Sequence, residues 1–247
     1  MDARTDRRLQ GTQERRCHPA HAAQRQRQDP AAGTARALLG RAGTASFVTA
    51  KQHAPATLRN RDPIAEVLAR ELPGSGTVLE IAAGTGEHAV FFAERFPALQ
   101  WQPTDPSPET LASIAAHRAD YAGANLAAPL LLDAADPDHW PVDAADAIVC
   151  INMVHISPWQ ATLGLFAGAG RLLAAGAPLV LYGPYIEDGV ETAPSNLEFD
   201  ASLKARNSLW GLREAAALDA LAAQHRLARS ARYALPANNI VLVYRRA

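Results

Sequence analysis

The segment Val78–His88 has the residue types and the spacing of a ligand-binding loop. It reads Val-Leu-Glu-Ile-Ala-Ala-Gly-Thr-Gly-Glu-His. Glycine lets the backbone turn tightly and lets a ligand approach main-chain N–H groups closely. A short apolar run precedes Gly84, and a helical pattern follows Gly86, so the first N–H groups of that helix are free to bind a ligand. The segment therefore predicts a strand, a loop and a helix that together bind a cofactor.

Three carboxylates accompany this loop. Glu80 lies within the expected strand and gives the pattern Glu80-x-Ala82-x-Gly84-x-Gly86. Asp105 ends the expected strand 100–104, where dinucleotide-binding folds place an acid that binds ribose. Asp133 ends the expected strand 129–132, where it can accept a hydrogen bond from an adenine amino group. For both aspartates the alternative is a simple capping role.

The glycine pattern alone permits two cofactors. Gly84-Thr85-Gly86-Glu87-His88-Ala89 also fits G-x-G-x-x-A, the fingerprint of nicotinamide-binding domains. Glu80, Asp133 and a hairpin expected at the end of the chain favour S-adenosylmethionine, because a dinucleotide-binding fold has little use for a carboxylate at Glu80.

The residues expected to do chemistry follow the fourth and fifth strands, since ligands of open α/β sheets bind at the carboxyl ends of the strands. After strand 147–151, Asn152 and Met153 are predicted to contact the cofactor, and His155 is predicted to accept a proton. The alternative for His155 is a structural hydrogen bond to a loop carbonyl. After strand 178–182, Tyr185 is predicted to line the path of the methyl group, and Tyr182 is predicted to contact the substrate. The alternative for both tyrosines is that they merely cover the end of the sheet.

Further candidates lie in flanking segments. Residues 186–211 form a long insertion, of the kind that often covers a substrate. In it, Asn196 and Arg206 are predicted to contact the substrate. For Arg206 the alternative is a salt bridge with Glu198 or Asp200. Asn60, before the first expected helix, is predicted to contact the cofactor.

Strands and helices alternate along the chain in the order needed to hold these residues. Asp62-Pro63 predicts the start of a helix that continues to residue 72. Helices are also expected at 87–96, 108–121, 159–173 and 214–225, with apolar strands between them. Strands 230–235 and 240–244 flank a short polar turn, which only an antiparallel hairpin allows. We therefore expect an α/β Rossmann-like sheet of seven strands, mostly parallel, with helices on both faces.

Several longer segments resemble a known family. They are Arg59–Ile64, Glu80–His88, Trp101–Asp105, Cys150–Pro158, Tyr182–Tyr185, Ser195–Asp200, Arg206–Gly211 and Leu235–Asn239. From about Lys51 to its end, the chain resembles class I S-adenosylmethionine-dependent methyltransferases. More closely, it resembles the methyltransferase-like 26 family, a family of unknown function. The resemblance implies the methyltransferase fold and the cofactor, but it implies no substrate.

Composition and charge limit the classes of partner and the cellular compartments to be considered. Residues 1–50 hold nine arginines and four acidic residues, a net charge of +5, so the overall charge of -1 leaves -6 for residues 51–247. An acidic domain does not favour nucleic acid as a partner. The first 50 residues are expected to be a disordered leader, and the alternative is a start codon assigned too far upstream, with no functional tail. No apolar run reaches the ~18–20 residues of a membrane helix. The two cysteines form no disulfide framework and no metal-ligand pattern, which favours a reducing cytoplasm.

The leading hypothesis is methyl transfer from S-adenosylmethionine to a small molecule or a protein. One alternative is a nicotinamide-dependent oxidoreductase. Another is a protein that binds S-adenosylmethionine without turning it over. The sequence does not determine the methyl acceptor or the oligomeric state.

Overall fold

The computed structural model describes residues 51–247. The leader predicted for residues 1–50 lies outside the described residues. The described part contains six α-helices and two short 3-10 helices. They are α1 (Pro55–Glu71), α2 (Glu87–Arg95), α3 (Pro108–Ala119), η1 (Pro137–His139), η2 (Met153–His155), α4 (Trp159–Leu172), α5 (Pro194–Arg206) and α6 (Ala215–Gln224).

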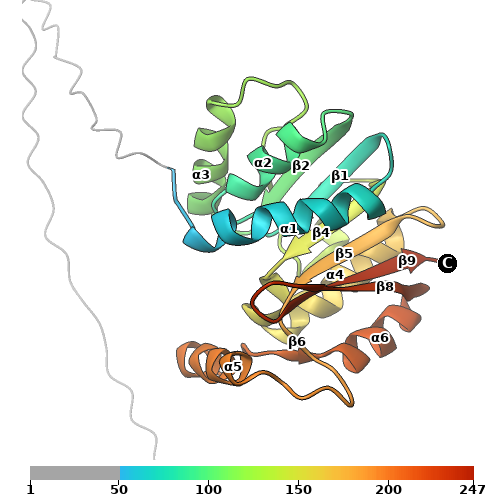
Figure 1. Cartoon of the computed structure of the whole chain (residues 1–247). Coiled ribbons are helices and arrows are strands. Elements are labelled where there is room, and N and C mark those ends of the chain that lie inside the picture. Colours follow the sequence, from blue (N-terminus) through green and yellow to red (C-terminus); the bar gives the residue numbers. More distant parts are fainter. Residues whose placement is uncertain (1–50) are drawn as a thin grey trace, which may run out of the picture. The chain divides into compact units, whose positions relative to one another are not determined.

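The strands form one large sheet and one small one (Figure 1). The strands are β1 (Gly76–Ile81), β2 (Leu99–Asp105), β3 (Leu130–Leu131), β4 (Ala147–Ile151), β5 (Pro178–Gly183), β6 (Tyr185–Ile186), β7 (Arg213–Glu214), β8 (Leu227–Leu235) and β9 (Asn239–Arg246). The large sheet has seven strands in the order β3-β2-β1-β4-β5-β9-β8. Strands β1 to β5 are parallel, while β9 is antiparallel to both of its neighbours. The predicted methyltransferase sheet is therefore confirmed, including its terminal hairpin.

Each face of the sheet packs against its own layer of helices (Figure 1). On one face, Leu68 of α1 and Phe92 of α2 cover Val78 and Val149. On the other face, helices α4 and α6 cover the side chains that alternate with these, such as Leu79 and Ile148. Because both faces are covered, the central strands are apolar along their length, as is typical of buried parallel sheets.

The first helix begins earlier than its sequence pattern predicts. The predicted start at Asp62-Pro63 is wrong, because α1 begins at Pro55 and contains Pro63 in its interior. Proline cannot donate the helical hydrogen bond to the residue four positions earlier, so the carbonyl of Arg59 loses that partner. Burial of Ile64, Val67 and Leu68 against the sheet stabilises the helix in spite of this loss.

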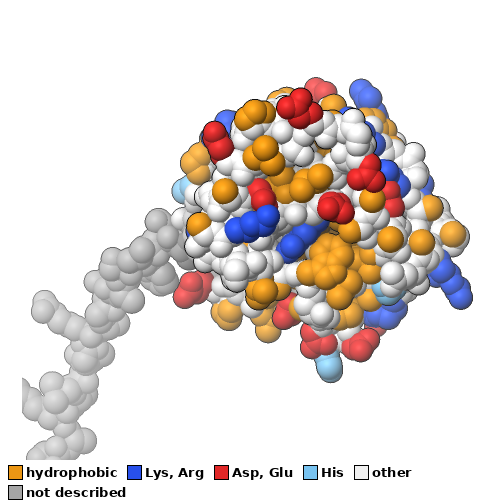
Figure 2. All heavy atoms as spheres, turned by 90° about the horizontal axis from the view of Figure 1, so that it is seen from below, with side chains coloured by type: hydrophobic (Ala, Val, Ile, Leu, Met, Phe, Trp, Pro, Cys, Tyr) orange, Lys and Arg blue, Asp and Glu red, His pale blue; other side chains and the backbone are white. Residues whose placement is uncertain are grey.

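The insertion before the last helix is more ordered than predicted. It contains α5, and its ends form the small parallel sheet in which Tyr185 pairs with Arg213. Figure 2 views the molecule from below Figure 1, the side on which α5 lies, and shows hydrophobic side chains gathered among acidic and basic ones. Within the described residues, Val190, Leu197 and Leu209 of the insertion are more than half exposed.

Among residues 51–247, no helix is long and apolar enough to cross a membrane.

Candidate functional site

Three adjoining cavities lie where the strand order reverses, at the carboxyl ends of the parallel strands. Ligands of open α/β sheets bind at this position, because the connections leave the sheet in opposite directions there. The cavities measure about 430, 310 and 520 Å³. We name them the glycine-loop cavity, the Asp133 cavity and the distal chamber. The first two share Ala82 and Met153, while the first and third share Asn152 and Ile156, so they form one continuous site.

The loop between β1 and α2 adopts the backbone conformation that its glycines permit. Ala82, Gly84 and Gly86 have positive φ angles of 56°, 59° and 92°. No atom lies within 4 Å of a Cβ added at Gly84, so this residue leaves open space in the glycine-loop cavity. A Cβ added at Gly86 would lie 2.8 Å from Ile114 Cα. The missing side chain of Gly84 therefore leaves space in the cavity. Gly86, which the sequence predicts to contact the cofactor, instead allows close packing against α3.

Asp105 connects the end of β2 to this loop. Its Oδ2 accepts a hydrogen bond from Gly84 N at 3.1 Å, and its Oδ1 accepts one from Ser107 N at 3.0 Å. Burial raises the pKa of the carboxyl, and these backbone bonds lower it. The side chain lines the glycine-loop cavity and is 7% exposed. Asp105 thus holds the loop and also presents a carboxylate to a ligand, so its capping and binding roles do not exclude each other.

Glu80 is the second carboxylate of the glycine-loop cavity. It is 1% exposed, and its Oε2 accepts a hydrogen bond from Trp101 Nε1 at 2.7 Å. Burial raises the pKa of this carboxyl to about 8; the Trp101 bond lowers it, and the charge of Asp105 raises it. A cationic group in the cavity would lower the pKa of this buried carboxyl and stabilise its ionised form.

Asp133 belongs to the neighbouring cavity. Leu132, Pro158 and Ala161 line that cavity with apolar surface, and Asp133 contributes a carboxylate at its edge. Oδ1 of Asp133 also accepts a hydrogen bond from Ala135 N at 2.8 Å. The arrangement suits a flat apolar group with a hydrogen-bond donor on its edge.

The segment after β4 lies where the three cavities meet. Asn152 has a φ of 64° and lines both the glycine-loop cavity and the distal chamber. Met153 lines the glycine-loop and Asp133 cavities, and its sulfur accepts a hydrogen bond from Ser157 Oγ at 3.0 Å. Both residues therefore lie where the sequence places cofactor contacts.

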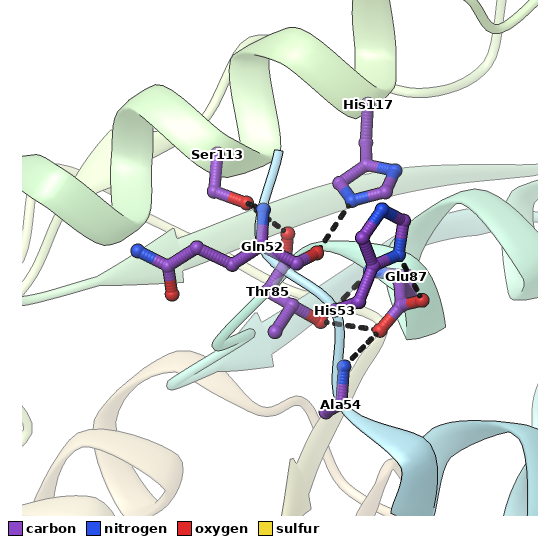
Figure 3. Close-up of polar contacts among 7 residues, drawn as sticks. All are labelled: Gln52, His53, Ala54, Thr85, Glu87, Ser113 and His117. Carbon is purple, nitrogen blue, oxygen red and sulfur yellow. Dashed lines mark hydrogen bonds and ion pairs between the residues drawn. The ribbon is translucent and has the colours of Figure 1, made fainter. Parts of the chain in front are cut away.

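An N-terminal strap, which we define as residues 51–54, crosses the start of α2 beside the glycine loop (Figure 3). Glu87 accepts hydrogen bonds from Ala54 N at 2.7 Å, His53 Nδ1 at 3.0 Å and Thr85 Oγ1 at 3.1 Å. On the α3 side, Gln52 donates from its N to Ser113 Oγ at 2.8 Å and accepts from His117 Nε2 at 2.9 Å. Ala54 lines the glycine-loop cavity, so the strap forms one of its walls. Sequence reasoning missed the strap, because its partners lie more than 30 positions away.

His155 lines the distal chamber and is 1% exposed. Burial, followed by the nearby charge of Arg213, lowers its pKa to about 4, so the imidazole is neutral near pH 7. Its Nδ1 is buried and has no hydrogen-bond partner among the described residues. The ring packs edge-on against Phe199, with centroids 5.6 Å apart. The loop-carbonyl bond considered for His155 is not formed through this nitrogen.

Tyr182, Asn196 and Asn60 also line the distal chamber. Asn196 Nδ2 donates to the Asn238 carbonyl at 3.0 Å and so joins α5 to the hairpin turn. The sequence predicts that Asn60 contacts the cofactor, but Asn60 is absent from the lining of the glycine-loop cavity and accepts a hydrogen bond from His88 Nε2 at 2.8 Å. Asn60 therefore lines the distal chamber, and its hydrogen bond connects it to His88, which lines the glycine-loop cavity.

The structure does not place Tyr185 or Arg206 in the distal chamber. Tyr185 packs in the core on the opposite face of the sheet from Tyr182, because three positions of nearly extended chain change the face. Arg206 is exposed, and its guanidinium lies 5.6 Å from the ring centre of Trp210. Its alternative salt bridge is not formed with either acid, since Asp200 instead pairs with Lys204.

Several chamber residues received no role from the sequence, among them Arg59 and Asn239. Arg59 lies within a segment that carries the family resemblance, but only the helical position of α1 shows that it reaches the chamber. Asn239 belongs to the predicted hairpin turn, which proves to line the chamber as well as connect β8 and β9.

A family model described as "Protein of unknown function (DUF938)" matches residues 51–246. This range covers nearly all of the described residues.

Solved methyltransferases share the fold. The methyltransferase CalO1 of calicheamicin biosynthesis, in its SAH-bound form, is 19% identical, with a TM-score of 0.62 over 78% of this chain and 55% of that chain. An O-methyltransferase family protein from Burkholderia thailandensis is 19% identical, with a TM-score of 0.65 over 78% and 57%. A putative sarcosine dimethylglycine methyltransferase from Galdieria sulphuraria is 15% identical, with a TM-score of 0.60 over 78% and 87%. The chain spans little more than half the length of the first two proteins.

Proposed function

The chain belongs to the DUF938 family, and from this premise we propose that it is an S-adenosylmethionine-dependent methyltransferase acting on a small molecule or a protein side chain. The observation that carries the proposal is the acidic lining beside the glycine loop. Glu80 and Asp105 line the glycine-loop cavity, and Asp133 lines the cavity next to it.

This charge pattern favours S-adenosylmethionine over a nicotinamide dinucleotide. S-adenosylmethionine carries positive charge on its sulfur and on its amino group, whereas a dinucleotide brings a negatively charged pyrophosphate. No lysine or arginine lines the glycine-loop or Asp133 cavity in the described part of the chain. Without a basic partner, the carboxylates of Asp105 and Asp133 would repel a pyrophosphate and attract a cation. A bound cation would also favour the ionised form of Glu80, whose pKa of about 8 keeps it protonated near pH 7 in its absence.

The cavities fit the parts of this cofactor. The open space beside Gly84 would take the amino-acid portion next to Glu80, and the carboxylate of Asp105 in the same cavity would accept hydrogen bonds from ribose hydroxyls. Asp133 is placed to accept a hydrogen bond from the adenine amino group within its apolar cavity. When bound, S-adenosylmethionine supplies an electrophilic methyl group on a positively charged sulfur.

The chain's own residues then position the acceptor. Asn152 and Ile156 lie at the junction of the glycine-loop cavity and the distal chamber, where donor and acceptor would meet. Holding the acceptor atom at roughly 3–3.5 Å supplies most of the catalysis that an in-line transfer needs. His155 lines the chamber in its neutral form, which is the form that accepts a proton from a hydroxyl or amine acceptor. Because burial lowers its pKa to about 4, it would pass that proton on rather than hold it near pH 7.

Isothermal titration tests the cofactor. We expect S-adenosylhomocysteine to bind the full chain in the micromolar range, NAD not to bind, and Gly84→Arg to abolish binding by filling the open space beside the loop. Binding of NAD alone would favour the oxidoreductase instead.

Turnover is tested separately. Wild type and Gly84→Arg are incubated with a labelled methyl donor and with metabolite or protein extracts, and label is followed in both fractions. Cofactor binding without any transfer of label would favour the non-catalytic alternative. Loss of transfer in His155→Phe, with S-adenosylhomocysteine affinity unchanged, would support the proton-accepting role.

A further inference from the structure

The distal chamber differs in charge from the two cavities beside it. Arg59 lines it, and no aspartate or glutamate does so in the described part of the chain. The other polar groups of the lining are uncharged, since burial keeps His155 neutral near pH 7. The continuous site therefore has carboxyls at one end and a single arginine at the other.

The charge of Arg59 reaches the interior of the chamber. Tyr182 is 5% exposed, and its burial raises the pKa of its hydroxyl; the bond with Asn60 and the positive charge of Arg59 act in the opposite direction. Arg59 is itself exposed and forms no ion pair with any residue in the range 51–247. Its guanidinium is thus available to a ligand.

The helix that carries Arg59 presents one side to the chamber. Ala56, Arg59, Asn60 and Pro63 all line it, at the spacing of one face of a helix. Burial of Ile64 and Leu68 against the sheet sets the orientation of this helix. Arg59 is therefore presented by a packed element rather than by a loop, which favours a fixed binding geometry.

Apolar side chains also line the chamber, and the volume of the chamber is limited. Ile156, Pro184, Phe199 and Leu235 contribute to a chamber of about 520 Å³. A volume of this order is typical of sites for small molecules. Hydrogen bonds between Asn196 and the Asn238 carbonyl, at 3.0 Å, and between Asn238 Nδ2 and Ser195 Oγ, at 3.2 Å, close one side.

We propose that the distal chamber binds a small carboxylic acid with an apolar body, its carboxylate paired with Arg59. This inference rests on the proposed function, because it takes the chamber to be the site of the methyl acceptor. One guanidinium matches one carboxylate through two parallel hydrogen bonds. The neutral amide of Asn60 lines the same chamber and adds a polar group that does not oppose the charge.

Matched acids and amides test the charge preference. Benzoate, phenylacetate, 3-phenylpropionate and the three corresponding amides are titrated into the full chain, both alone and with saturating S-adenosylhomocysteine. We expect at least one acid to bind at least about tenfold more tightly than its amide, a difference of about 1.4 kcal/mol. Equal binding of acids and amides, or no binding by any acid, would overturn the proposal.

Variants then assign the preference to Arg59. Arg59→Met is expected to remove the advantage of the acid over its amide, and Arg59→Lys is expected to keep part of it. Arg206→Met is the matched control, because Arg206 is exposed and lies outside the chamber lining. An unchanged acid preference in Arg59→Met would contradict the inference, as would equal loss in Arg206→Met.

The outcome is separable from that of the proposed function. Failure of S-adenosylhomocysteine to bind would contradict the methyltransferase proposal. The affinities of the acids and of the matching amides for the ligand-free chain would still decide what the chamber binds. Melting temperatures of the three variants check that folding is intact, which is expected because neither arginine is buried.

Discussion

Glu80 makes the stability of the domain depend on pH, and Glu80→Gln tests how. The side chain is 1% exposed, and its burial raises the pKa from 4.5 to about 8. In the unfolded chain the carboxyl ionises near pH 4.5, whereas in the folded chain it stays protonated until about pH 8. Between these values the folded state binds more protons, so the free energy of unfolding decreases as pH rises.

The size of the effect follows from the same interval. Each pH unit between the two pKa values lowers the free energy of unfolding by about 1.4 kcal/mol. Glu80 is therefore expected to lower this free energy by about 3–5 kcal/mol at pH 8 relative to pH 4.5. The glutamine of the Glu80→Gln variant has no proton to lose, and its amide oxygen can still accept the hydrogen bond from Trp101. Any cost of its added N–H groups is independent of pH and leaves the slope unaffected.

The assay is thermal unfolding of the ligand-free chain between pH 5 and pH 9, followed by circular dichroism. The melting temperature of Glu80→Gln minus that of wild type is expected to rise with pH by about 6–20 °C, at about 2–4 °C per kcal/mol for a domain of this size. Glu109→Gln is the control, because Glu109 is an exposed acid in the first turn of α3. A difference that stays constant with pH would refute the reasoning.

Three further perturbations test other parts of the site. Gly86→Ala is expected to lower the free energy of unfolding by about 2–4 kcal/mol, because φ is 92° and the new Cβ would lie 2.8 Å from Ile114 Cα; an unchanged urea midpoint would contradict this. Glu87→Gln removes a carboxylate that binds the strap, so amide hydrogen exchange at residues 52–54 should quicken while Glu109→Gln leaves it unchanged. His155→Phe is expected to flatten the loss of stability between pH 6.5 and about 4, because the buried imidazole of the wild type resists protonation over that range at about 1.4 kcal/mol per pH unit; the same acid slope in both proteins would rule this out.

The central features of the fold follow from local sequence. An apolar run, two glycines and a helical pattern within 78–96 predict the β1–α2 unit, and the structure contains it. The hairpin also follows from local chemistry, since Ala237 and Asn238 adopt positive φ angles of 58° and 55° in the short turn between β8 and β9. Each of these elements depends on contacts between near neighbours in the chain, so its residues carry the signal.

Other features required the tertiary structure. Pro63 looks like the start of a helix, but packing of α1 on the sheet extends the helix back to Pro55. Tyr182 and Tyr185 look equivalent at the end of the fifth predicted strand, but Tyr182 lies within β5, and the two side chains lie on opposite faces of the sheet. In both cases the local pattern permits two arrangements, and burial against distant elements selects one.

The sequence by itself determined the glycine loop, its carboxylates and the order of strands that brings them together, because spacing and hydrophobic period are local properties. Only the tertiary structure decided that Glu80 contacts Trp101, that residues 51–54 bind Glu87, and that Arg59 lines the distal chamber. These outcomes depend on strand register and on the rotation of α1 against the sheet. Both are set by packing between segments more than 20 residues apart, and no local pattern encodes that packing.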